Sequence, residues 1–251
     1  MSNYTSADRL YEILNRLLGA GPSGDAHAVF RSVFDLPDSE SREVIYKYLM
    51  KTIDLSSTLK KTSKTLGGRI AGRFEPHIEK IQEALLSIKL ENTNSSLNLF
   101  WHKLSDRAAM EVLSIFAGYI ADNNIEKDIK QEELEAIQQE IDNLIQTIEN
   151  SAIDASLRTS LIANLKSMEK SIQEYGFFGI LPVSDIIQKT TGQVVLESLQ
   201  TEQTEESKGI IQSVLELMRN FNTIVSYGAN SQVLLTGIAT VIPMLSDKVQ
   251  L

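Results

Sequence analysis

The chain has 251 residues, of which 42% are hydrophobic and 23% are charged, and it contains no cysteine. These values are typical of a soluble globular protein, and they exclude disulfides, a thiolate nucleophile and a cysteine-based zinc site. The net charge of −9 lies wholly in the second half, because 18 acidic residues stand against 9 basic ones from Glu126 onward. This acidic half disfavours general binding to nucleic acids, whose phosphates it would repel.

The first residues, MSNYTSADRLYEIL, carry no basic start followed by an apolar run. We therefore expect no secretory signal. Together with the lack of cysteine, this favours a cytoplasmic protein of a bacterium. Contact with the periphery of the inner membrane is the alternative location.

Helical spacing of apolar residues begins near the N-terminus. It predicts a first helix over residues 6–18, which the sequence GAGPSG ends because glycine and proline interrupt helices. Asp25 is expected to cap a second helix, and Pro37 with Asp38 to start a third. The N-terminal region should therefore be a series of helices.

A polar stretch, DLSSTLKKTSKTLGGRIAGRF, follows the third helix. Further helices are predicted over residues 74–90 and 97–121, and the second of these should break near Ser105. The loop NTNSS lies between them. All five prolines are expected at helix edges, at Pro22, Pro37, Pro76, Pro182 and Pro243.

Two helices with regular apolar spacing are the clearest structural signal in the second half. Their apolar residues recur every three or four positions, which predicts an antiparallel, coiled-coil-like hairpin joined by a short link near Asn150. The expected seam consists of Ile137, Ile141, Leu144, Ile148, Leu157, Leu161, Leu165 and Met168. Core packing is the favoured role of all of these residues.

The sequence EYGFFGILP should end the hairpin, with Gly176 as a left-handed cap. Two more helices are predicted, over residues 183–199 and 205–221. The expected fold is all-α, a multi-helix bundle with a long antiparallel helical hairpin and an apolar C-terminal helical segment. Its expected domains are an N-terminal helical bundle over 1–125 and the hairpin with C-terminal apolar helices over 126–251, and one continuous domain is the alternative.

The order of a helical hairpin, an EYG turn, an amphipathic helix and an apolar C-terminal segment, over residues 126–245, resembles uncharacterised all-helical bacterial proteins. Proteins of that kind are often products of mobile islands that carry phage-defence genes. The resemblance implies a component of a bacterial defence system. It carries no catalytic motif, so it assigns no functional residue.

No pattern of residues typical of catalysis or metal binding is found in the sequence. The three histidines, His27, His77 and His102, lack a second histidine at the spacing of a zinc-binding helix. The carboxylates of Glu132, Glu133, Glu135 and Glu140 have no histidine beside them for a di-iron site, so a solvated face is the favoured interpretation. We therefore expect no cofactor, no metal and no enzymatic activity.

The only basic cluster consists of Lys60, Lys61, Lys64, Arg69 and Arg73, with no acidic residue between Asp54 and Glu75. We predict that it binds an acidic protein partner and not a specific nucleic-acid sequence, because no aromatic residue for base stacking lies among these cations. The favoured alternative is that the cluster pairs with the chain's own acidic half.

No charged residue occurs from Asn220 to Ser246. Its apolar part, Val233 to Leu245, is about 20 Å long as a helix, whereas a bilayer core is about 30 Å thick. We expect burial in protein, with conditional membrane contact as the alternative. The residues predicted to form this oligomer or membrane segment are Phe221, Ile224, Val225, Val233, Leu234, Leu235, Ile238, Val241, Ile242 and Leu245.

These observations rank three classes of function. A non-catalytic interaction or assembly protein, with a protein partner or self-association, comes first because the chain offers much amphipathic helix surface. A membrane-acting protein that inserts or forms a pore with the uncharged segment comes second. An enzyme without a recognisable motif comes third.

Overall fold

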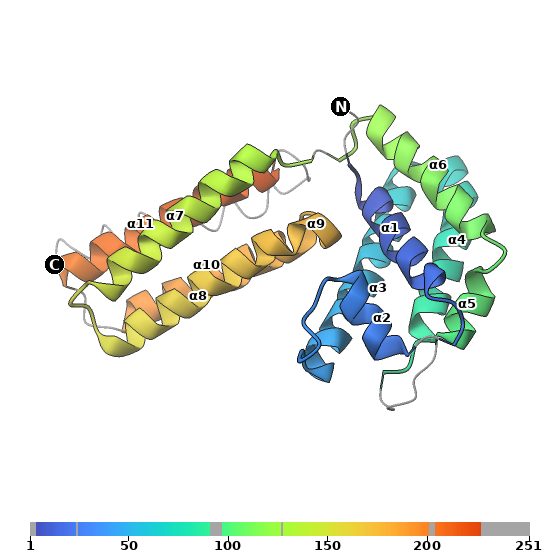
Figure 1. The fold of residues 1–251 in the computed structure, drawn as a ribbon. Helices are drawn as coiled ribbons and strands as arrows, with labels where there is room; N and C mark the ends of the chain where they lie inside the picture. The colour runs from blue at the N-terminus through green and yellow to red at the C-terminus, as the bar shows by residue number, and fades with distance from the viewer. Residues whose placement is uncertain (1–3, 24, 91–96, 127, 201–203, 227–251) are drawn as a thin grey trace. The chain divides into compact units, whose positions relative to one another are not determined.

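The computed structural model describes residues 4–23, 25–90, 97–126, 128–200 and 204–226. Within these residues the chain forms eleven helices and no strand, so the predicted all-α multi-helix bundle is confirmed (Figure 1). The helices are α1 (Ser6–Gly19), α2 (Ala26–Val33), α3 (Arg42–Thr65), α4 (Gly68–Leu86), α5 (Asn98–Leu104), α6 (Ala108–Asp122), α7 (Gln131–Glu149), α8 (Ala155–Gln173), α9 (Tyr175–Phe178), α10 (Leu181–Gln200) and α11 (Glu205–Ser226). The chain divides into two compact units, Met1–Glu126 and Lys127–Leu251.

The N-terminal unit is built on the antiparallel pair of α3 and α4. α1 packs against α2, α3 and α6, and α4 packs against α5 and α6 as well as α3. Phenylalanine side chains fill much of the interior: Phe30, Phe100 and Phe116 are fully buried. Phe74 of α4 stacks on Phe116 of α6 with ring centroids 4.4 Å apart, so aromatic packing joins these two helices.

The second helix begins as the sequence predicts, because the side chain of Asp25 accepts hydrogen bonds from the backbone N–H groups of His27 and Ala28. The third helix begins later than predicted. Its N-cap is Ser41, whose hydroxyl accepts from the N–H of Val44 at 3.4 Å. Pro37 therefore precedes the helix instead of starting it.

The polar stretch after Asp54 is not a separate segment, since α3 continues through it to Thr65. Leu55 and Leu59 are fully buried there. The hydroxyls of Ser56 and Ser63 donate to backbone carbonyls three residues earlier, at 2.6 and 2.9 Å. Hydroxyl groups that bond to their own helix can be buried at little cost, which explains how so polar a sequence remains helical.

α4 also differs from its predicted range, because it begins at Gly68 and contains Pro76 within it. The prediction that Pro76 lies at a helix edge is wrong. Its ring is exposed, so water can satisfy the carbonyl that the missing N–H leaves free. The predicted break near Ser105 is present: Arg107 adopts a left-handed conformation with φ 56°, and α5 and α6 lie on either side of it.

The C-terminal unit contains a four-helix bundle. α8 packs against α7 and α10, and α11 packs against α10 and α7, so the four long helices close a ring in chain order (Figure 1). The predicted antiparallel hairpin is its first half, α7 and α8. The predicted seam residues are buried in the core, except Leu144, which is partly buried against it.

The turn between α8 and α10 differs from the predicted cap. Gly176 lies inside the short helix α9, and Gly179, with φ 62°, makes the left-handed turn. The helical turn of α9 is held in place by Tyr175. The Tyr175 hydroxyl accepts a hydrogen bond from the N–H of Ile129 at 2.7 Å and donates one to Asp128 at 2.5 Å. With Tyr175 anchored and Phe178 buried, the chain reverses only afterwards.

Candidate protein-interaction surface

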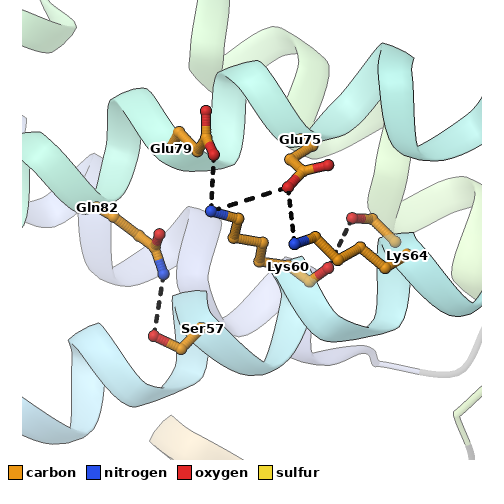
Figure 2. A network of polar contacts seen from close by, with 7 residues as sticks. Ser57, Lys60, Lys64, Glu75, Glu79 and Gln82 are labelled. Atoms are coloured by element: carbon orange, nitrogen blue, oxygen red, sulfur yellow. Dashed lines mark hydrogen bonds and ion pairs between the residues drawn. The ribbon is translucent and has the colours of Figure 1, made fainter.

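Polar contacts along one edge of α3 and α4 define the register of the pair (Figure 2). Lys64 lies 3.1 Å from Glu75 and Lys60 lies 2.7 Å from Glu79. One step further along, Gln82 donates to the hydroxyl of Ser57 at 2.9 Å. Each step back along α3 matches an equal step forward along α4, as expected for antiparallel helices with a constant register. We refer to these six residues as the α3–α4 ladder.

The ladder neutralises part of the basic cluster. A hydrogen bond from the Lys60 ammonium holds the pKa of the Glu79 carboxyl below its ordinary value, and the same bond raises the pKa of Lys60. Both groups are therefore charged near neutral pH. The contribution of Glu79 to stability is present above its unfolded pKa and is lost as pH falls through the lowered folded pKa. It is small, because exposed ion pairs are screened by water.

The five residues of the basic cluster separate into two groups. The ion-pair partners of Lys60 and Lys64 among the described residues come from α4, within the N-terminal unit. Pairing of the cluster with the acidic second half stays a prediction. Lys61, Arg69 and Arg73 are exposed and form no ion pair in the described part of the chain. The Arg73 guanidinium lies 5.8 Å from the ring centre of Phe74. Three unneutralised cations therefore flank the turn between α3 and α4.

The excess of positive charge extends over both α3 and α4, the antiparallel pair that we call the α3–α4 hairpin. Between Arg42 and Leu86 the sequence holds nine Lys and Arg and five Asp and Glu, in a protein whose net charge is −9. The hairpin is therefore a basic region on an acidic protein. A surface with this charge attracts acidic partners over distances of about 10 Å at moderate ionic strength.

Exposed apolar side chains lie at the other end of the hairpin, which sequence reasoning did not find. Tyr46 is 53% exposed, Met50 37% and Leu86 66%. Continuing the register of the ladder places Leu86 across from Ile53 and one helical turn from Met50. The available signal was the i, i+4 spacing of Tyr46 and Met50, away from the buried Ile45 and Leu49.

The residues predicted for an oligomer or membrane segment fall mostly beyond α11. Phe221 is fully buried in the bundle core, Ile224 is partly buried against it, and Val225 lies in α11. The remaining positions, Val233, Leu234, Leu235, Ile238, Val241, Ile242 and Leu245, lie outside the described residues. Among the helices that the structure describes, none combines the length and hydropathy needed to cross a bilayer.

The histidines and the acidic residues of α7 differ in how far they are exposed. His27 is buried, His77 is half-buried, and His102 is exposed with its ring 5.6 Å from that of Trp101. Glu132, Glu133 and Glu135 are exposed and Glu140 is partly so, as a solvated face requires. The residues with a described position contain no group of three or more His, Asp or Glu that could hold a metal ion.

An open hollow of about 450 Å³ lies between α1 and α2, lined by Arg16, Ala20, Val29, Ser32 and Val33. Its one charged group already has partners. The Arg16 guanidinium donates to the carbonyl of Val33 at 2.9 Å and lies 4.0 Å from Asp35. The hollow therefore offers no unpaired charge to a ligand.

Two polar side chains in the bundle core lack hydrogen bonds. Asn222 of α11 and Thr190 of α10 are both 0% exposed, and no side-chain oxygen or nitrogen of either has a partner among the described residues. An unsatisfied buried polar group costs about 1–3 kcal/mol. These positions therefore lower the stability of the bundle.

Replacing Asn222 with Leu should stabilise the C-terminal unit by about 1–2 kcal/mol, because an apolar side chain of similar size removes that cost. Urea unfolding followed by far-ultraviolet circular dichroism measures the change. Asn220→Leu is the matched control, since Asn220 is exposed on the same helix. Equal effects at the two positions would mean that Asn222 is not buried.

The chain was also compared with known proteins. No protein-family model matches it, and neither the curated proteins nor the solved structures contain a match. The surfaces of this chain are therefore the basis for a function.

Proposed function

We propose that the protein is a non-catalytic interaction or assembly protein that binds an acidic partner protein through the α3–α4 hairpin. The observation that supports this most is the charge that remains after the ladder forms. Lys61, Arg69 and Arg73 stay exposed and unpaired within the described structure, on a protein that is acidic overall. A partner with carboxylates at matching positions would neutralise them.

A protein partner fits this surface better than a nucleic acid does. Phe74, the aromatic residue nearest the cations in sequence, is buried, so it offers no platform for stacking a base. The net charge of −9 would oppose the approach of a long phosphate backbone. The exposed apolar side chains at the far end of the hairpin add a contact that a protein can cover.

Reversing the three unpaired cations tests the proposal. In the full-length chain, Lys61→Glu, Arg69→Glu and Arg73→Glu together should weaken binding of a fluorescein-labelled Glu- and Leu-containing helical peptide by at least about tenfold. Loss of three exposed charge pairs at about 0.5 kcal/mol each gives this factor. Fluorescence anisotropy at two salt concentrations measures it, and the difference should shrink at the higher one.

The matched control reverses Lys166, Lys170 and Lys189, which are exposed in the C-terminal unit. This variant has the same net charge as the first, so a general charge effect would weaken both equally and contradict the proposal. Tight, salt-sensitive binding of duplex DNA that the first variant alone abolishes would also contradict it, because the surface would then be a phosphate site.

The membrane-acting function stays a prediction, because it depends on the uncharged segment, most of which lies outside the described residues. A role in a bacterial defence system also stays a prediction, since it is based on the resemblance of residues 126–245 alone.

A further inference from the structure

We infer that α10 unfolds as a unit while α7, α8 and α11 remain packed, so that the C-terminal bundle opens at one helix. This opening lies in the C-terminal unit and is independent of the binding function proposed for the α3–α4 hairpin. Three properties of α10 support it: little buried apolar surface, a sequence that favours helix weakly, and buried polar groups without hydrogen bonds along its length.

α10 contributes the fewest buried apolar side chains to the bundle. In the described part of the chain these are Val183, Ile187 and Val194, whereas α7 and α8 have four each and α11 has seven. Removal of apolar surface from water is the main force that holds a helix in a bundle. This force therefore holds α10 less strongly than it holds the other three helices.

The centre of α10 has a low intrinsic preference for helix. Residues 187–195 read IQKTTGQVV, and threonine, valine and above all glycine are poorer helix formers than alanine. Gly192 lies in the middle of this stretch and is exposed. A sequence of this kind gains little from remaining helical once it has left its neighbours, so separation and unfolding occur together.

A buried asparagine faces α10 from α8. Ser160 of α8 donates a hydrogen bond to Glu197 of α10, and Asn164 lies four residues further along α8. Residues four apart share one face of a helix, so Asn164 lies on the edge of α8 that faces α10. It is 7% exposed, and its side-chain nitrogen has no hydrogen-bond partner among the described residues.

A second buried asparagine faces α10 from α11. Thr191 of α10 donates to the sulfur of Met218 at 3.4 Å, and Asn222 lies four residues after Met218 on the same face of α11. As described above, neither side-chain atom of Asn222 has a partner within the described structure. An unsatisfied amide therefore borders α10 on each of its two sides.

Both asparagines lie level with one short part of α10. Neighbouring helices of the ring run antiparallel (Figure 1), so four residues forward on α8 or α11 correspond to four residues back on α10. This register places Asn164 level with Gln193 and Asn222 level with Ile187, about 9 Å apart along α10. The unpartnered hydroxyl of Thr190 lies between them. All three groups gain water when α10 leaves, which offsets part of the cost of exposing its apolar side chains.

Unfolding of α10 changes the surface that the C-terminal unit presents. In the closed bundle α10 packs against α8 and α11. Once it unfolds, the sides of these two helices that it covers reach water. α10 therefore controls access to the apolar interior of this unit.

Hydrogen–deuterium exchange of the full-length chain, followed residue by residue by NMR, tests the opening. After correction for intrinsic rates, the amides of residues 187–195 should exchange at least about tenfold faster than those of residues 161–168 in the middle of α8. The reason is that unfolding of α10 exposes the first group while the second stays protected.

Removing the unsatisfied hydroxyl supplies the second measurement. Thr190→Val keeps the shape of the side chain and should slow exchange in α10 about tenfold, because the closed bundle no longer buries an unpaired polar group. Thr191→Val is the control. The Thr191 hydroxyl donates to the carbonyl of Ile187 at 2.8 Å, so its removal should not slow the exchange.

A pair of glycines distinguishes unfolding of α10 from unfolding of the whole unit. Gly192 of α10 and Gly209 of α11 are both exposed, and a Cβ atom added at either would meet no other heavy atom within 4 Å. Gly192→Ala should slow exchange in α10 about fivefold, because alanine favours the helical state. Gly209→Ala should leave exchange in α10 unchanged.

Selective slowing of α10 by Thr190→Val and Gly192→Ala supports the inference. Exchange in α10 that matches exchange in α8, or that slows equally with Gly192→Ala and Gly209→Ala, overturns it, because the helices would then unfold together. No effect of Thr190→Val also overturns it. The acidic-partner function is tested by its own variants in the N-terminal unit, so the two proposals fail separately.

Discussion

Replacing Leu161 with Asp should unfold the C-terminal unit or lower its stability by several kcal/mol. Leu161 is 0% exposed in the middle of α8, and an unpaired carboxylate buried there has neither water nor a cation to stabilise it. Since a domain is stable by only about 5–15 kcal/mol, the loss is a large fraction of the total. Urea unfolding followed by far-ultraviolet circular dichroism measures it.

Ser167→Asp is the matched control for this change. Ser167 is exposed on the same helix, so the new charge stays in water and should alter stability by no more than about 0.5 kcal/mol. Trp101, the only tryptophan, lies in the N-terminal unit, and its fluorescence reports separately on that unit. A Leu161→Asp variant that unfolds at the wild-type urea concentration would show that the seam is wrong.

Replacing Phe116 with Ala should destabilise the N-terminal unit by about 3–5 kcal/mol. Phe116 is fully buried and its ring lies 4.4 Å from that of Phe74, centre to centre. The change removes this ring contact and leaves a cavity between α4 and α6. The fluorescence of Trp101 during urea unfolding measures the loss, because Trp101 lies on α5, which packs against both of these helices.

The neighbouring residue supplies the control. Ile115 is 51% exposed, so Ile115→Ala should cost less than about 1 kcal/mol. A comparable loss at both positions would mean that the face of α6 assigned to the core is wrong. A large loss at Phe116 alone supports the assignment.

Local pattern was sufficient to predict the fold class and most of the helices. The seam of Leu161 and its neighbours could be predicted because helical spacing of apolar residues is a property of the sequence itself. The cap at Asp25 could be predicted because it involves only residues 25–28, which are neighbours in the sequence. The break near Ser105 was also a local signal, in a region where apolar spacing is interrupted.

Where a long-range contact decides the local structure, sequence reasoning was wrong. α3 continues to Thr65 because Leu55 and Leu59 are buried by neighbouring helices, although the surrounding residues are polar. The turn falls at Gly179 and not at Gly176, because Asp128 and Ile129, more than forty residues away, hold Tyr175 in place. Residues this far apart have no sequence signal that pairs them.

The candidate surface on α3 and α4 also has some features that the sequence determines and others that only long-range contacts determine. The sequence by itself determined that the basic cluster exists and that no acidic residue lies within it. Only the tertiary structure decided that Glu75 and Glu79 neutralise Lys60 and Lys64, and that Lys61 remains available. The physical reason is that ion pairing falls steeply with distance, and the distances between two helices depend on a packing register that neither helix contains alone.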